Sequence, residues 1–262
     1  MPQHASFGFI AIVLFAGAVW SCDEEKNPAP NSAIASSPIE TASPISSKAP
    51  PPEAKPAPKP KRNSSDCPKR TTIAFPSADF EAAVRLKLQK PQGDVKLQDL
   101  RRLRSLNLSQ TKLTELDVCL FPHMKQLREL FIGPGQVDDI SPLASLTKLE
   151  SLRLSLNPVR DLKPLAEMTQ LDRLDLAHTE VGDLHPLEGL TNLTELLLDD
   201  TPVQDVAPLS SLTKLTVLVL KNTRVKDVTP LRALKALKTL DLRGAPVDDW
   251  TSLARPGLRI QQ

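Results

Sequence analysis

The chain has 262 residues and a formal net charge of +2, with acidic and basic residues interspersed, no tyrosine and few other aromatic side chains. This balance excludes the basic surface and the aromatic stacking platforms that are typical of nucleic-acid-binding proteins. A stretch rich in Pro, Ser and Ala ends before Cys67, and the leucine-rich sequence that follows is long enough to bury one hydrophobic core.

An apolar run extends from Phe7 to Trp20 near the N-terminus. Its length suits the core of a signal peptide better than a membrane span, although no Lys or Arg precedes it. We therefore predict a signal peptide over residues 1–21 and an exported protein. Residues 22–66 lack large apolar side chains almost entirely, which predicts a disordered tether.

The segment that ends in Ser21 and Cys22 resembles the lipobox of bacterial lipoproteins, although Trp20 is bulkier than that pattern favours. The resemblance implies that Cys22 is lipidated and holds the protein in the cell envelope or on the outer surface of a bacterium. The alternative is cleavage by an ordinary signal peptidase and secretion. Two thiols then remain, Cys67 and Cys119, and in an oxidising compartment they are candidates for a disulfide.

A helical N-terminal cap is predicted within residues 67–102. Ser77 is a good N-cap residue, and Phe80, Val84 and Leu88 recur at helical spacing behind it.

Residues 103–262 contain an internal repeat, which we interpret as seven units and a partial end. The period is 22 residues after a first unit of 24, and the units start at Leu103, Leu127, Leu149, Leu171, Leu193, Leu215 and Leu237. Apolar residues at positions 1, 4 and 6 of each unit predict a short strand with one buried face. Position 9 holds a short side chain that can bond the backbone of an adjacent coil, such as Asn157 or Thr179.

Position 13 is acidic in every unit and position 16 is Pro in five of them, for example Asp161 and Pro164. We interpret the carboxylates as caps of a short turn or 3₁₀ segment rather than as a metal or catalytic array, because each is needed to close its own turn. No His-x-x-x-His or Cys-x-x-Cys spacing and no nucleotide-binding or nucleophile motif occurs in the sequence. We therefore expect no metal, no cofactor and no catalytic residue.

The unit Leu-x-x-Leu-x-Leu, with Asn or Thr at position 9 and Asp-Leu-x-Pro-Leu after it, resembles the internalin class of bacterial leucine-rich repeats. The segment from Phe75 to Leu88 resembles the helical cap of internalins. The resemblance implies an α/β fold: a right-handed leucine-rich-repeat solenoid, or horseshoe, with a concave parallel β-sheet, a convex side of short 3₁₀ helices or turns, and the helical cap. No immunoglobulin-like domain and no cell-wall sorting signal follows the repeats in this sequence.

Side chains at positions 3, 5 and 7 of each unit are expected to point outward from the concave face. Several are apolar and are bordered by charges, as in binding patches. The candidate partner-binding residues are Phe131, Arg153, Arg173, Asp175, Glu195, Leu197, Val217, Val219 and Asp241.

The sequence thus predicts a monomeric, non-enzymatic module that binds a partner on its concave face. The partner is expected to be another protein, with a glycan as the alternative; no nucleic acid is expected, and membrane contact only through the lipid anchor. Two other functions stay open: a structural envelope protein that self-associates through the solenoid end, and a regulator or inhibitor of an envelope enzyme.

Overall fold

The computed structural model describes Cys67 and residues 73–262. The signal peptide expected at residues 1–21, the tether expected at 22–66 and the lipidation expected at Cys22 lie outside the described residues. None of the helices in the described part of the chain is long and apolar enough to span a membrane.

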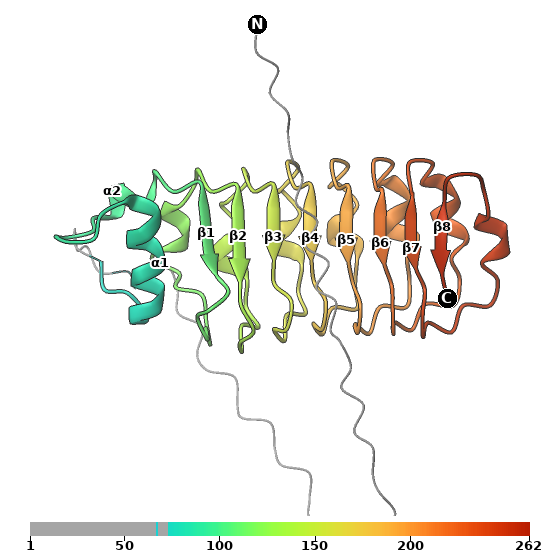
Figure 1. Cartoon of the computed structure of the whole chain (residues 1–262), viewed down its shortest axis with the longest axis horizontal. Coiled ribbons are helices and arrows are strands. Elements are labelled where there is room, and N and C mark those ends of the chain that lie inside the picture. Colours follow the sequence, from blue (N-terminus) through green and yellow to red (C-terminus); the bar gives the residue numbers. More distant parts are fainter. Residues whose placement is uncertain (1–66, 68–72) are drawn as a thin grey trace, which may run out of the picture. The chain divides into compact units, whose positions relative to one another are not determined.

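Eight short parallel strands form one sheet in which each strand pairs with the next in chain order (Figure 1). They are β1 Ser105–Leu108, β2 Glu129–Ile132, β3 Ser151–Arg153, β4 Arg173–Asp175, β5 Glu195–Leu197, β6 Val217–Val219, β7 Thr239–Asp241 and β8 Arg259–Gln261. Equivalent residues of successive units lie opposite one another, so that Leu130, Leu152 and Leu174 form one row. The predicted right-handed leucine-rich-repeat solenoid with a concave parallel sheet is confirmed.

Short 3₁₀ helices on the convex side return the chain from one strand to the next. They are η2 Phe121–His123, η3 Ser141–Leu143, η4 Lys163–Leu165, η5 His185–Leu187, η6 Ala207–Ser211, η7 Thr229–Ala233 and η8 Thr251–Leu253. The Asp column closes the turns of η3 to η8 as predicted, since each of its Asp carboxylates accepts a hydrogen bond from the backbone N–H two residues on. Ahead of η2, Asp117 accepts such a bond from Cys119. Asp161 accepts from Lys163 at 2.9 Å, and Asp205 accepts from Ala207 at 2.8 Å.

The core lies between the sheet and the 3₁₀ helices. Columns of stacked leucine side chains fill it, with one column for each inward-facing position of the repeat. Leu152, Leu154 and Leu165 of one coil are each at most 1% exposed. The side chains at position 9 were expected to bond the backbone of an adjacent coil, but the Thr hydroxyls at this position bond the backbone of their own coil. Thr201, for example, donates to the Leu198 carbonyl at 2.6 Å. A Thr side chain is too short to reach the next coil, whereas the longer Asn157 donates to the Gly133 carbonyl of the preceding coil at 3.0 Å.

Helix α1 (Ala78–Leu88) covers the N-terminal end of this core, and a single turn, α2 (Leu97–Leu100), follows it. Ser77 caps α1 as predicted by accepting a hydrogen bond from the Phe80 N–H. Phe80 is fully buried and contacts the Phe121 ring edge-on, with ring centroids 6.0 Å apart. The helix therefore shields the first coil from water.

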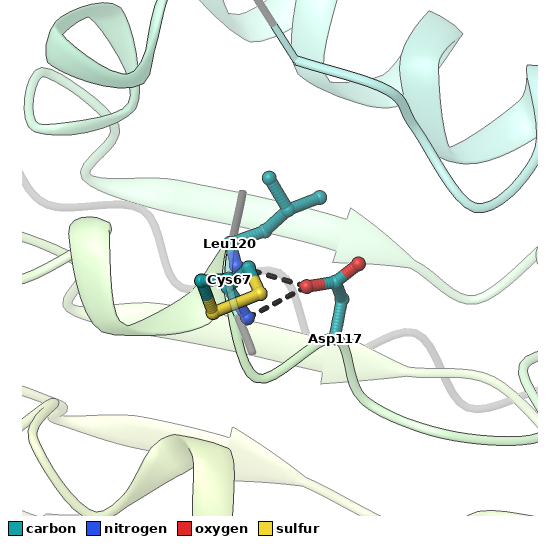
Figure 2. Close-up of a disulfide and its surroundings, with 4 residues drawn as sticks. Cys67, Asp117 and Leu120 are labelled. Carbon is teal, nitrogen blue, oxygen red and sulfur yellow. Dashed lines mark hydrogen bonds between the residues drawn. A yellow bond between two sulfur atoms is a disulfide. The ribbon is translucent and has the colours of Figure 1, made fainter. Parts of the chain in front are cut away.

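Cys67 and Cys119 are joined by a disulfide in the structure, with their Cα atoms 5.5 Å apart (Figure 2). Asp117 lies beside the bond and accepts hydrogen bonds from the backbone N–H groups of Cys119 and Leu120, at 2.7 and 3.1 Å. The disulfide fastens the chain ahead of α1 to the first coil.

Candidate functional site

The outward side chains of the first five strands surround a hollow of about 380 Å³ on the concave face, which we call the concave hollow. Six of the nine candidate partner-binding residues line it: Phe131, Arg153, Arg173, Asp175, Glu195 and Leu197. The sheet places them there because its register sets equivalent positions of successive coils side by side, as Phe131 opposite Arg153. The hollow is therefore assembled from residues that are far apart in the sequence.

Three side chains interact in series along the hollow. The Arg153 guanidinium lies over the Phe131 ring, 6.0 Å from its centroid, and its Nε donates to Oδ2 of Asp175 at 2.8 Å. Arg153 keeps 54% of its side chain exposed, whereas Asp175 keeps 15%. Arg153 is thus held in one orientation from both sides while most of its surface stays open to a partner.

The apolar members of the candidate surface are half-buried rather than fully exposed. Leu197 pairs with Asp175 on one side and with Val219 on the other, and Val217 pairs with Glu195. Val217 and Val219 do not line the concave hollow but adjoin it at β6. They extend its apolar side by one strand.

Asp241 does not belong to the exposed surface, contrary to our expectation from its position in the repeat. It is only 5% exposed, because Arg243 folds over it and donates from Nε and Nη2 to the two carboxylate oxygens. These hydrogen bonds lower the pKa of the Asp241 carboxyl below its usual value. The carboxylate is committed to Arg243 and is not available to a partner.

Sequence reasoning expected three further polar residues on the concave face but did not choose them as partner-binding candidates. Asn107, Ser109 and Ser151 line the concave hollow beside the predicted residues. Sequence reasoning missed Leu156, which does not line the hollow but is 49% exposed and has a φ of 61°, in the left-handed region that a branched apolar residue rarely adopts. A comparison of the repeats could have indicated the unusual backbone at Leu156. The equivalent position in later units holds His178, Asp200, Asn222 or Gly244.

No protein-family model matches the sequence, and no curated protein matches it. Solved structures do match this chain. An internalin C2 from Listeria monocytogenes is 32% identical, with a TM-score of 0.65 over 71% of this chain and 83% of its own. An internalin F from the same organism is 31% identical, also with a TM-score of 0.65 over 71% of this chain.

The present chain spans 55% of the length of that internalin F. A leucine-rich-repeat protein from Leptospira interrogans shares 20% identity, with a TM-score of 0.51 over 63% of this chain and 50% of its own. At that level of identity the likeness supports the fold alone.

Proposed function

Because the chain belongs to the internalin-type leucine-rich-repeat proteins of bacteria, we propose that it is a non-enzymatic recognition module that binds another protein on its concave face. The observation that carries the proposal is the concave hollow. Phe131 and Leu197 provide apolar surface there, and charged side chains border it. Apolar surface with a polar rim is typical of protein-binding sites.

The arrangement of Phe131 and Arg153 supports a protein partner. Aromatic and Arg side chains are enriched among the residues that contribute most to protein–protein affinity. Arg153 is already oriented by Phe131 and Asp175, so its ordering on binding costs little conformational entropy. The hollow also extends across five strands of an open sheet, which suits a segment of a macromolecule better than an enclosed small molecule.

The double variant Phe131→Glu with Leu197→Glu is expected to lose its partner, because it places two negative charges on the apolar surface of the hollow. The full chain serves as bait in a cross-linking pull-down from bacterial cell envelopes. We expect the wild type to capture a protein and the variant to retain less than about a tenth of it, since the loss of two central contacts costs at least about 1.4 kcal/mol.

The matched control is Thr147→Glu with Thr213→Glu, which adds the same charge at two exposed positions outside the strands. It is expected to capture the partner as the wild type does, and circular dichroism checks that all three proteins are folded. Equal capture by all three proteins would place the interface outside the concave hollow. Self-association measured by light scattering would then favour the structural envelope function, and a changed enzyme activity in the captured fraction would favour the regulatory one.

We also propose that the module is exported and anchored in the envelope by a lipid on Cys22. Cys22→Ala is expected to move the protein from the membrane pellet to the soluble fraction and to abolish incorporation of labelled palmitate, because the thiol is the attachment point. Ser21→Ala keeps a small residue before the Cys and should behave as the wild type. Unchanged membrane association of Cys22→Ala would disprove the lipid anchor, whereas a wild type that is already in the soluble fraction and takes up no palmitate would favour secretion.

A further inference from the structure

His178, Asp199 and Asp200 come together at the turns that follow β4 and β5, outside the residues that line the concave hollow. Each residue places one potential ligand atom within 4.8 Å of those of the other two. Nε2 of His178 lies 3.7 Å from Oδ2 of Asp199, and Nδ1 lies 3.6 Å from Oδ2 of Asp200. One imidazole nitrogen and two carboxylate oxygens thus lie near one another, one from each residue.

The backbone at this position is fixed by the repeat. His178 and Asp200 occupy the same place in successive coils and share the left-handed conformation, with φ of 54° and 56°. The N–H of His178 donates to the Asp199 carbonyl at 2.8 Å, and the N–H of Asp200 donates to the Lys221 carbonyl at 2.9 Å. The three side chains therefore project from a rigid turn ladder rather than from a loose loop.

Asn222, in the next coil, holds one of the carboxylates. Its Nδ2 donates to Oδ1 of Asp200 at 2.9 Å, which leaves Oδ2 facing His178. Gly244 makes room for this amide, because a Cβ at that position would lie 2.2 Å from Oδ1 of Asn222. A hydrogen bond that orients a ligand from behind is a regular feature of metal sites in proteins.

The charges at this cluster favour a cation. Two carboxylates converge on one imidazole, and their distances to its nitrogens are too long for hydrogen bonds. Among the described residues, the ion pairs that Asp199 and Asp200 form are with His178. A mixed set of one imidazole nitrogen and carboxylate oxygens suits Zn²⁺, whereas Ca²⁺ and Mg²⁺ prefer oxygen ligands alone.

We propose that His178, Asp199 and Asp200 form a surface zinc-binding site, with Asn222 as a positioning residue. The inference goes beyond the proposed function and does not rest on it. The three residues supply one nitrogen and two oxygen ligands, and water completes the coordination. Motif spacing along the chain does not indicate this site, because its ligands come from two neighbouring coils.

Isothermal titration calorimetry of the full chain, without a histidine tag, with ZnCl₂ tests the proposal. We expect one saturable site in the wild type, and its loss in His178→Asn, Asp199→Asn and Asp200→Asn. Asn222→Gly tolerates the left-handed backbone and is expected to weaken zinc binding about tenfold, as removal of an orienting hydrogen bond does. CaCl₂ should give a much weaker response.

His185→Asn is the matched control, since His185 is an exposed histidine that bonds Asp183 on the convex side. It should bind zinc as the wild type does, and circular dichroism confirms the fold of every variant. The proposal is overturned if the wild type takes up no zinc, or if His178→Asn takes up as much as the wild type does. Full affinity in both Asp199→Asn and Asp200→Asn would equally exclude the assigned ligands.

Discussion

Replacing both Cys67 and Cys119 with Ser is expected to lower the free energy of unfolding of the N-terminal end of the solenoid by about 4 kcal/mol. The disulfide closes a loop between residues 52 positions apart, and a loop of this length removes considerable entropy from the unfolded chain. Without it, the segment ahead of α1 is no longer fastened to the first coil. The leucines that α1 covers then become exposed more readily.

Repeat proteins are stabilised mainly by contacts between neighbouring repeats, so the loss should be greatest in the first coils. Urea unfolding followed by circular dichroism measures the total change, and amide hydrogen exchange resolves it by repeat. The single variants Cys67→Ser and Cys119→Ser should lose as much stability as the double variant, because either substitution removes the bond. Should the Cys67 and Cys119 double variant unfold at the same urea concentration as the wild type, apolar packing of Phe80 on Phe121 would suffice to hold the cap.

Asn157→Ala is expected to lower the free energy of unfolding by about 2–4 kcal/mol, because it leaves several buried backbone groups without partners. Asn157 is 2% exposed. Its Nδ2 donates to the carbonyls of Gly133, Leu154 and Ser155 at 3.0–3.2 Å, and its Oδ1 accepts from the Val137 N–H at 3.2 Å. Two of these contacts reach the preceding coil.

The preceding coil depends on Asn157 because it has no polar side chain at the equivalent position. Gly135 occupies that place, and a Cβ there would lie 2.3 Å from the Leu113 carbonyl oxygen. Thr201→Ala is the matched control, since it removes a single bond within one coil and should cost about 1 kcal/mol. Urea unfolding of both variants measures the difference. Equal losses for the two variants would mean that the two hydrogen bonds from Asn157 to the preceding coil add nothing to stability.

The repeat period predicted most of the fold, because a one-strand coil can bury its leucines only by stacking on identical neighbours. The strands lie at the expected positions of every unit, and the inward residues are buried as the alternation required. The Asp column was also interpretable, since Asp161 needs only its local backbone to close a turn. Features that depend on one coil, or on equivalent positions of all coils, are readable from sequence.

Features that arise from pairs of unlike residues were not readable in this way. Asp241 was expected to be exposed because its position is outward, but the pattern carries no information on whether Arg243 folds over it. The cluster of His178 with Asp199 and Asp200 depends on which residues occupy adjacent coils. Such neighbours are brought together when the repeats are aligned as columns, whereas a search for motifs along the chain keeps them apart.

Because the strands pair in register, equivalent side chains on the concave face are separated by whole multiples of the distance between neighbouring strands. Each coil advances the sheet by one strand separation, about 4.8 Å. Phe131 in β2 and Leu197 in β5 are therefore three steps apart, or about 14 Å along the solenoid axis. Deleting or duplicating one 22-residue unit between them would change this interval by one step while leaving both side chains on the same face. The number of repeats between two contact residues thus sets the distance between them, and this distance can match the dimensions of a partner.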